Sequence, residues 1–197
     1  MLSPLDVLLL VAQTFERIGI GYVVVGSFAS SARGRARATA DVDMIADMRS
    51  EQIPLLTAAL AEAFYVDEGA IRRAIESRRS FNLIHLDSMF KVDVFIPPPV
   101  GFRREQLRHR RREAVTSDPE ESVYLATAED TVLAKLQWYE NGGRVSERQW
   151  SDVLGVLDVQ ANRLDVEYLR ATAKELRLDA LLEVAFEQCV ASDSESE

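Results

Sequence analysis

Two aspartates at the start of an apolar segment place the strongest constraint on this fold. Asp41 and Asp43 stand one residue apart and lead directly into Met44-Ile45-Ala46. Side chains alternate along a strand, so the two carboxylates would share one face, with Val42 and Met44 on the other. Like charges gathered at the head of a buried strand are unfavourable unless a cation compensates them. The stretch therefore predicts a strand over 41–46 with one cation-binding face.

A third carboxylate follows the same pattern in the segment FKVDVFI, residues 90–96. Its alternate residues are apolar, which puts Asp93 on the opposite face. FNLIHL (81–86) precedes it across Asp87-Ser88, so the two segments form a predicted hairpin. Mg²⁺ takes oxygen ligands and shares carboxylates with substrate phosphates, so it suits such a face. A lone Asp-x-Asp is also compatible with a solvated strand end.

The chain changes character at the proline run Pro97–Pro99. Before it, helical and strand patterns alternate as α-β-α-β-α-β-β, and proline should end the sheet-forming part. After it, Thr127 and Ser146 open helical segments in capping-box patterns. We expect an α+β fold, with a small mixed β-sheet core and helices on one face, followed by a C-terminal helical bundle. The expected ranges are 1–100, 101–192 and an acidic tail over 193–197.

Charge and cysteine content restrict the functional classes. The net charge of −9 and a pI near 4.9 argue against sequence-independent nucleic-acid binding. Cys189, the single cysteine, excludes an intramolecular disulfide, and its apolar surroundings predict a buried thiol in a reducing compartment. No stretch approaches the roughly 20 apolar residues of a membrane span, so we expect a cytoplasmic protein without a membrane partner.

Gly26 and Ser27 end the apolar strand segment YVVV and precede a short helical turn. Glycine lets a backbone approach a phosphate closely. Amides at the start of the following helix would bind that anion, and the Ser27 hydroxyl follows directly. A phosphate site close to the paired carboxylates is therefore predicted.

At this point the sequence resembles a known superfamily. VVVGSFASSARGRARATADVDMI is similar to the signature of the DNA polymerase β-like nucleotidyltransferases, and FKVDVF to the strand with their third carboxylate. Two later stretches, ATAEDTVLAKLQWYENGGRVSERQWSDVLGVL and NRLDVEYLRATAKEL, resemble a bacterial stand-alone branch. That branch is related to abortive-infection toxin components and to aminoglycoside nucleotidyltransferases. The resemblance spans residues from about 19 to about 180.

The resemblance implies an NTP-using enzyme that transfers NMP to a hydroxyl and releases pyrophosphate. Asp41, Asp43 and Asp93 would be its catalytic and metal-binding residues, with Mg²⁺ or Mn²⁺ as cofactor. Asp93 would share a metal and could activate the acceptor hydroxyl as base. ATP is one possible donor, and the acceptor could be tRNA, a protein or a small molecule.

The resemblance also implies which residues bind the nucleotide: Gly26, Ser27, Arg37, Thr39 and Lys135. Alternatives stay open for two of them. Lys135 could be a surface lysine on an amphipathic helix, and Arg37 could neutralise the paired aspartates instead of meeting phosphate.

Several charged residues have simpler explanations. Glu129 and Asp130 read as first-turn acids that complement a helix dipole. Arg148 and Asp152, four residues apart, could form a helical ion pair, although the resemblance hints at a cleft role for Asp152. Six arginines between Arg103 and Arg112 could bind RNA, but we favour a solvated helix that pairs with nearby acids. His85, in an apolar strand, is expected to be a satisfied core histidine.

Two rival functions remain. The chain could be a non-catalytic nucleotide- or partner-binding module, with a cognate partner protein as in toxin-antitoxin-like pairs. It could also be a metal phosphohydrolase that uses the same carboxylates with water as acceptor.

Overall fold

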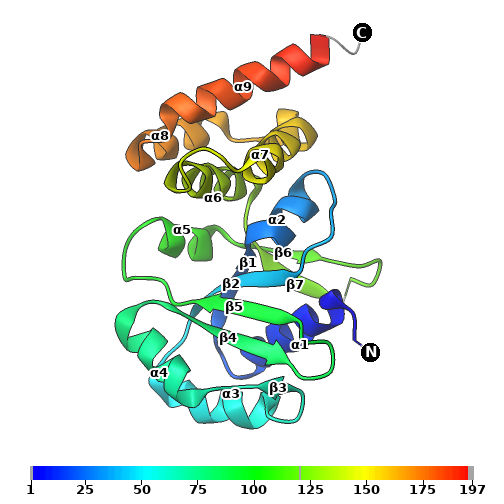
Figure 1. Cartoon of the computed structure of the whole chain (residues 1–197), viewed down its shortest axis with the longest axis vertical. Coiled ribbons are helices and arrows are strands. Elements are labelled where there is room, and N and C mark those ends of the chain that lie inside the picture. The colour runs from blue at the N-terminus through cyan, green and yellow to red at the C-terminus, as the bar shows by residue number, and fades with distance from the viewer. Residues whose placement is uncertain (1, 120, 195–197) are drawn as a thin grey trace. The chain divides into compact units, whose positions relative to one another are not determined.

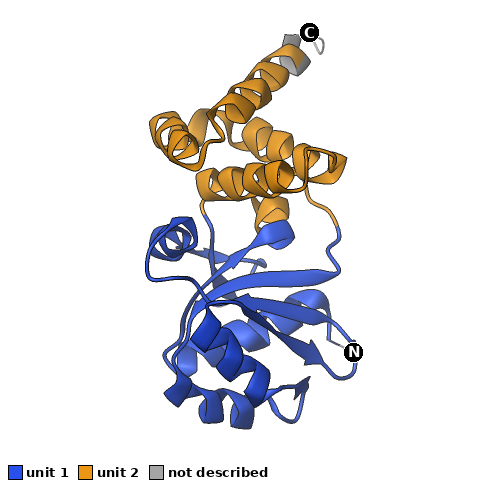
Figure 2. Cartoon of the chain, turned by 60° about the vertical axis from the view of Figure 1, so that its left-hand side comes forward, with its two compact units in different colours: residues 1–28, 38–126 blue, residues 29–37, 127–197 orange. Residues whose placement is uncertain are grey.

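The structure is a computed structural model, which describes residues 2–119 and 121–194. The chain forms two compact units, shown in Figure 2. One comprises Met1–Phe28 and Ala38–Ala126, and the other Ala29–Arg37 and Thr127–Glu197. We call them the sheet unit and the helical unit.

The sheet unit holds all the strands found in the described residues (Figure 1). Its elements are α1 (Pro4–Arg17), β1 (Gly21–Val25), the start of α2 (Gly26–Arg33), β2 (Asp41–Asp47), the 3₁₀ turn η1 (Ser50–Gln52), α3 (Ile53–Leu60), β3 (Phe64–Tyr65), α4 (Glu68–Ser77), β4 (Ser80–His85), β5 (Lys91–Phe95), α5 (Phe102–His109), β6 (Arg111–Ala114) and β7 (Ser122–Leu125). They build one mixed sheet of order β3-β4-β5-β2-β1-β7-β6.

One face of this sheet is covered by α1, α3 and α4 (Figure 1). The first helix starts as its sequence predicts, because the Ser3 hydroxyl accepts from the Asp6 amide and the Asp6 carboxylate accepts from the Ser3 amide. Val42 and Met44 are fully buried in the core beneath the sheet. The expected α+β class with a mixed sheet and a helical C-terminal part is confirmed.

The sheet does not end at Pro97–Pro99, and this expectation was wrong. Proline stops a strand because it lacks an amide hydrogen, and β5 does end at Phe95. The chain then passes through α5 and returns as the β6–β7 hairpin. In this hairpin β7 pairs parallel with β1, along the edge of β1 that faces away from β2. The sheet unit therefore continues to Ala126, beyond the boundary expected at residue 100.

The helical unit contains α6 (Ala128–Asn141), α7 (Glu147–Gln160), the turn η2 (Ala161–Arg163), α8 (Val166–Leu176) and α9 (Asp179–Ser194). Thr127 and Ser146 are the N-caps of α6 and α7, as predicted, and each side chain accepts a bond from the amide three residues on. Residues 195–197 of the predicted acidic tail lie outside the described residues. Within those described, no helix is long and apolar enough to cross a membrane.

The helical unit also includes residues 29–37, which lie in sequence between two strands of the sheet unit. Gly34 approaches α7 so closely that a Cβ on it would lie 2.8 Å from backbone atoms of Gly155. The Gln160 side chain donates to the Arg33 carbonyl oxygen (2.6 Å), and Arg35 pairs with Asp158 (3.1 Å). The second half of α2 and the loop after it are thus packed on α7.

Candidate functional site

The predicted carboxylates meet on neighbouring strands of the sheet unit. β2 and β5 run parallel, with Asp43 opposite Asp93 in the register. Directly opposed residues point to the same face, and adjacent strands are about 4.8 Å apart. Asp41 shares that face because it lies two residues before Asp43. The structure therefore brings the three predicted carboxylates onto one face of two adjacent strands.

A lysine, which the sequence analysis did not single out, lies within this group. Lys91 is the register partner of Asp41, and its Nζ lies 2.7 Å from Oδ2 of Asp93. The hydrogen bond to Asp93 raises the pKa of Lys91, and the charges of Asp93, Asp41 and Asp43 act in the same direction against partial burial. The alternation that predicts Asp93 on the polar face also puts Lys91 there, so the sequence contains the signal that could have identified this lysine.

Gly26 borders the same group. It has φ +63° at the junction of β1 and α2, and a Cβ on it would lie 2.0 Å from Oδ2 of Asp43. Only glycine provides that space and adopts that backbone conformation without strain. The N-terminus of α2, with Ser27 as its second residue, therefore begins next to Asp43. Ser27 is half-buried and already engaged with neighbours.

Thr39 supports the Asp41 backbone. Its hydroxyl donates to the Asp41 carbonyl oxygen at 2.7 Å, whereas Oδ1 of Asp41 is 3.5 Å away. In this structure Thr39 therefore fixes the entry into β2, and its contact with phosphate stays a prediction.

A divalent cation fits this face in donor chemistry, because Asp41, Asp43 and Asp93 all offer carboxylate oxygens. Between residues 2–119 and 121–194, however, no three His, Cys, Asp or Glu side chains stand close enough together to hold a metal ion as placed. Oδ2 of Asp93 is engaged by Lys91. The strand positions place all three carboxylates on the face where a metal would bind.

In the helical unit, Lys135 and Arg37 both bind Asp152. The Arg37 guanidinium donates from Nε to Oδ1 (2.9 Å) and from Nη2 to Oδ2 (2.8 Å), while Lys135 Nζ lies 2.7 Å from Oδ2. Lys135 is only 4% exposed, so it is not a surface lysine. Arg37 does neutralise an aspartate, but this aspartate is Asp152 of α7 and not one of the paired aspartates of β2. The expected Arg148–Asp152 ion pair was wrong, because Asp152 instead receives these two cations.

The two cations control the charge state of Asp152. Burial alone would raise the pKa of its carboxyl group, but the hydrogen bonds from Arg37 and Lys135 outweigh burial and lower it from 3.8 to about 2. Asp152 is therefore ionised at neutral pH.

Asp130 is more than a first-turn acid. It is fully buried, and its Oδ1 accepts a 2.6 Å hydrogen bond from the Tyr168 hydroxyl of α8. Glu129 accepts from the Asp165 amide (2.9 Å) at the start of the same helix. Both acids thus connect α6 to α8, a long-range contact that helix-dipole reasoning could not reveal.

The arginine-rich segment is largely paired within the sheet unit, as the simpler interpretation expected, but the expected single helix was wrong: α5 ends at His109, and Arg111 and Arg112 lie in β6. Arg104 pairs with Asp47 (2.7 Å), Arg108 with Glu105 (2.8 Å) and Arg112 with Glu16 (3.2 Å). Two further arginines stack on aromatic rings: Arg103 on Phe95 and Arg110 on Tyr124. His85 likewise is buried, as predicted, with its Nδ1 2.8 Å from the Ser88 hydroxyl.

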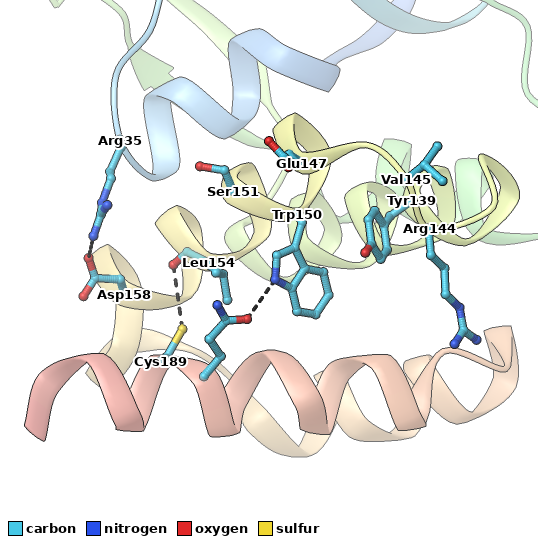
Figure 3. A pocket seen from close by; sticks show the side chains of 11 residues that line it. Arg35, Tyr139, Arg144, Val145, Glu147, Trp150, Ser151, Leu154, Asp158 and Cys189 are labelled. Carbon is cyan, nitrogen blue, oxygen red and sulfur yellow. Dashed lines mark hydrogen bonds and ion pairs between the residues drawn. The ribbon is translucent and has the colours of Figure 1, made fainter.

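A cavity of about 320 Å³ opens within the helical unit (Figure 3). The rings of Tyr139 and Trp150 pack at 5.1 Å along its wall, and the Trp150 indole donates to Gln188 (2.9 Å). Cys189 lines it and is half-buried, so the expected buried thiol is confirmed only in part. None of the predicted site residues is among those that line this cavity.

The fold is that of nucleotidyltransferase-like proteins. An antigenic nucleotidyltransferase-like protein from Paracoccidioides brasiliensis superposes with a TM-score of 0.53 at 15% identity, over 93% of this chain and 92% of that one. The antibiotic-resistance factor ANT(2'')-Ia gives 0.52 at 11% identity in its solution structure, over 93% and 97%.

A crystal structure of ANT(2'')-Ia in complex with adenylyl-2''-tobramycin also gives a TM-score of 0.52, at 14% identity over 88% of this chain and 98% of that one. No protein-family model matches the sequence, and neither does any functionally curated protein. At these identities the similarity establishes the fold.

Proposed function

We propose that the chain is a divalent-metal-dependent nucleotidyltransferase that moves NMP from an NTP to a hydroxyl acceptor. The observation that carries this proposal is the register of β2 and β5, which sets Asp43 against Asp93 with Asp41 on the same face. Gly26 adds support, because it opens α2 beside Asp43. The nucleotidyltransferase-like fold is consistent with this chemistry.

In the proposed reaction, Asp41 and Asp43 hold the metal and Asp93 shares it. Bound Mg²⁺ or Mn²⁺ would neutralise the triphosphate and stabilise charge on the attacking and leaving oxygens. Amides at Gly26 and Ser27 bind phosphate oxygens at the start of α2. Asp93 takes the proton of the acceptor hydroxyl while the hydroxyl oxygen forms a bond to the α-phosphorus. The bond between the α-phosphorus and the oxygen that bridges the α- and β-phosphates breaks, and pyrophosphate leaves.

Thr39, Arg37 and Lys135 have supporting roles in this proposal. Thr39 fixes the backbone of Asp41. Arg37 and Lys135 are proposed phosphate contacts because the resemblance implies this role, and both bind Asp152 in the structure. ATP is the first donor to test.

The acceptor class can be narrowed by experiment. Five arginines of the 103–112 segment already have carboxylate or aromatic partners, which makes RNA a poorer candidate there. ANT(2'')-Ia was crystallised with an adenylated aminoglycoside. A panel of aminoglycosides therefore comes before tRNA and protein acceptors.

The deciding experiment is calorimetric binding of each of the four NTPs, with and without Mg²⁺, to wild type and to Asp41→Asn/Asp43→Asn. We expect metal-dependent binding that this double variant loses. Asp47→Asn is the matched control, because Asp47 lies on the same face of β2 and pairs with Arg104 instead.

The rivals predict different outcomes. If no NTP binds at millimolar concentration, the chain is a partner-binding module, and copurification would seek a cognate protein. If α-³²P-labelled NTP yields only free labelled NMP or NDP in the presence of acceptors, the chemistry is hydrolysis. Label on the acceptor supports nucleotidyl transfer.

A further inference from the structure

Lys91 occupies an unusual place for a lysine. Its strand β5 pairs with β2 so that Lys91 faces Asp41, while Asp93, two residues on, faces Asp43. The four side chains thus form two adjacent rows on one face, with three carboxylates and one ammonium. The lysines of this chain are Lys91, Lys135 and Lys174. Of these, Lys91 is the one placed among the predicted metal ligands.

The Lys91 ammonium engages a carboxylate that the metal would need. Its Nζ is 2.7 Å from Oδ2 of Asp93, and the Asp93 side chain is only 17% exposed. A pair on an open surface contributes little because water competes for both partners. Here the Lys91 side chain is 40% exposed, so water screens the pair in part. The carboxylate is largely buried and two more negative charges share its face, so the attraction is stronger than in a fully exposed pair.

This contact also offsets part of the charge on the carboxylate face. Asp41, Asp43 and Asp93 carry three negative charges, and Lys91 neutralises one of them at contact distance. Asp93 is also a proposed metal ligand, so the Lys91 ammonium and a divalent cation would be attracted to the same carboxylate.

We propose that Lys91 is a built-in cation that competes with the divalent metal for Asp93. Its ammonium and the metal are attracted to the same carboxylate, so metal binding weakens or replaces the contact between Lys91 and Asp93. The inference rests on the proposed function, because it assumes that the three aspartates receive a metal. Lys91 is a positioning residue in this scheme, since it acts through Asp93.

Mn²⁺ binding, measured by electron paramagnetic resonance of the free ion, tests the proposal without any activity assay. Lys91→Gln removes the competing charge, so we expect the Kd for Mn²⁺ to fall by at least roughly tenfold, the effect of one unit charge about 6 Å from a divalent ion even at the dielectric constant of water. Lys91→Arg keeps the charge and should stay near wild type. Lys174→Gln, on the exposed side of α8, is the control for loss of a lysine elsewhere.

A second measurement leaves Lys91 in place. Reductive ¹³C-methylation of the lysines gives few NMR signals, and Lys91→Arg identifies the one from Lys91. We expect saturating Mg²⁺ to shift that signal toward its position in Asp93→Asn, while the Lys174 signal stays fixed. A Lys91 signal that Mg²⁺ leaves unmoved would overturn the proposal even if Lys91→Gln folds poorly.

The outcomes separate the inference from the proposed function. If wild type binds Mn²⁺, Asp41→Asn/Asp43→Asn does not, and Lys91→Gln has an unchanged or higher Kd, the metal site stands and the role of Lys91 is wrong. If Lys91→Gln binds Mn²⁺ and wild type does not, the inference is supported and the competition is stronger than expected. If no variant binds Mn²⁺, both the metal-dependent function and the inference fail.

Discussion

Gly26 lies against Asp43 so closely that the glycine has no room for a side chain. A Cβ at this position would stand 2.0 Å from the carboxylate oxygen of Asp43 and 2.9 Å from its Cβ. The glycine of the Gly-Ser motif is therefore needed to leave space for the Asp43 carboxylate, in addition to any approach of a phosphate. This contact gives a direct test of how the end of β1 shapes the candidate site.

Gly26→Ala should displace Asp43 and weaken Mn²⁺ binding at least about tenfold. Gly19→Ala is a matched control, because Gly19 also has positive φ (+72°) but a Cβ added there would meet nothing within 4 Å. Both variants should lose about 1 kcal/mol from backbone strain, and Gly26→Ala about 1–3 kcal/mol more from overpacking. Urea unfolding and Mn²⁺ titration measure the two effects. If both variants lose the same free energy of unfolding and bind Mn²⁺ with the same Kd, the contact with Asp43 is unimportant.

Gly34 and Gly155 offer a second matched pair, within the helical unit. Gly34→Ala would place its Cβ 2.8 Å from the Gly155 backbone, so we expect a loss of about 1–3 kcal/mol. Gly155→Ala meets Arg35 only at ordinary contact distance, 3.5 Å, and lies inside α7, where alanine is favoured by up to about 1 kcal/mol. In thermal unfolding, Gly155→Ala should have the highest Tm, wild type the next and Gly34→Ala the lowest. A stable Gly34→Ala would show that residues 29–37 are not packed on α7 as described.

Asp152 should matter more for stability than either of its cations. Asp152→Asn would deprive the buried ammonium of Lys135 of this carboxylate, at a cost of about 3 kcal/mol. Lys135→Met leaves Asp152 with the bidentate Arg37 and should cost only about 1 kcal/mol. Chemical denaturation of the two variants provides the comparison. If Lys135→Met proves the more damaging, Arg37 does not compensate Asp152.

The same carboxylate should make stability depend on pH in the acid range. The pKa of Asp152 is about 2 in the folded protein, below its ordinary 3.8, so the folded state binds fewer protons. Its contribution is complete above about pH 5 and is lost as the pH falls from about 4 toward 2, by on the order of 1–2 kcal/mol. Urea unfolding at intervals between pH 2.5 and 6 checks this. Asp152→Asn should flatten that part of the curve, and an unchanged slope would contradict the assignment.

Local signals in the sequence predicted much of the fold. Capping side chains at Ser3, Thr127 and Ser146 act within three residues, and the alternation in residues 90–96 fixes which face Asp93 takes. These features depend on near neighbours in the chain, so the printed sequence contains them.

Partners far apart in sequence were harder to predict. Arg37 and Asp152 are 115 residues apart, and helical spacing instead suggested Arg148. The β6–β7 hairpin joins the sheet beside β1, a pairing that no local pattern near Pro97–Pro99 reveals. Lys91, in contrast, has a local signal: it lies two residues before Asp93 and therefore points to the same face of β5.

The path of the chain between the two units has a consequence for gene architecture. The polypeptide enters the helical unit at Ala29, leaves it after Arg37 and returns at Thr127. No single cut can therefore release either unit intact, and a stop codon after Ala126 would strip residues 29–37 of their partners on α7. Shuffling or fusing half of such a gene would separate residues that pack together, so we expect its two parts to be inherited as one piece.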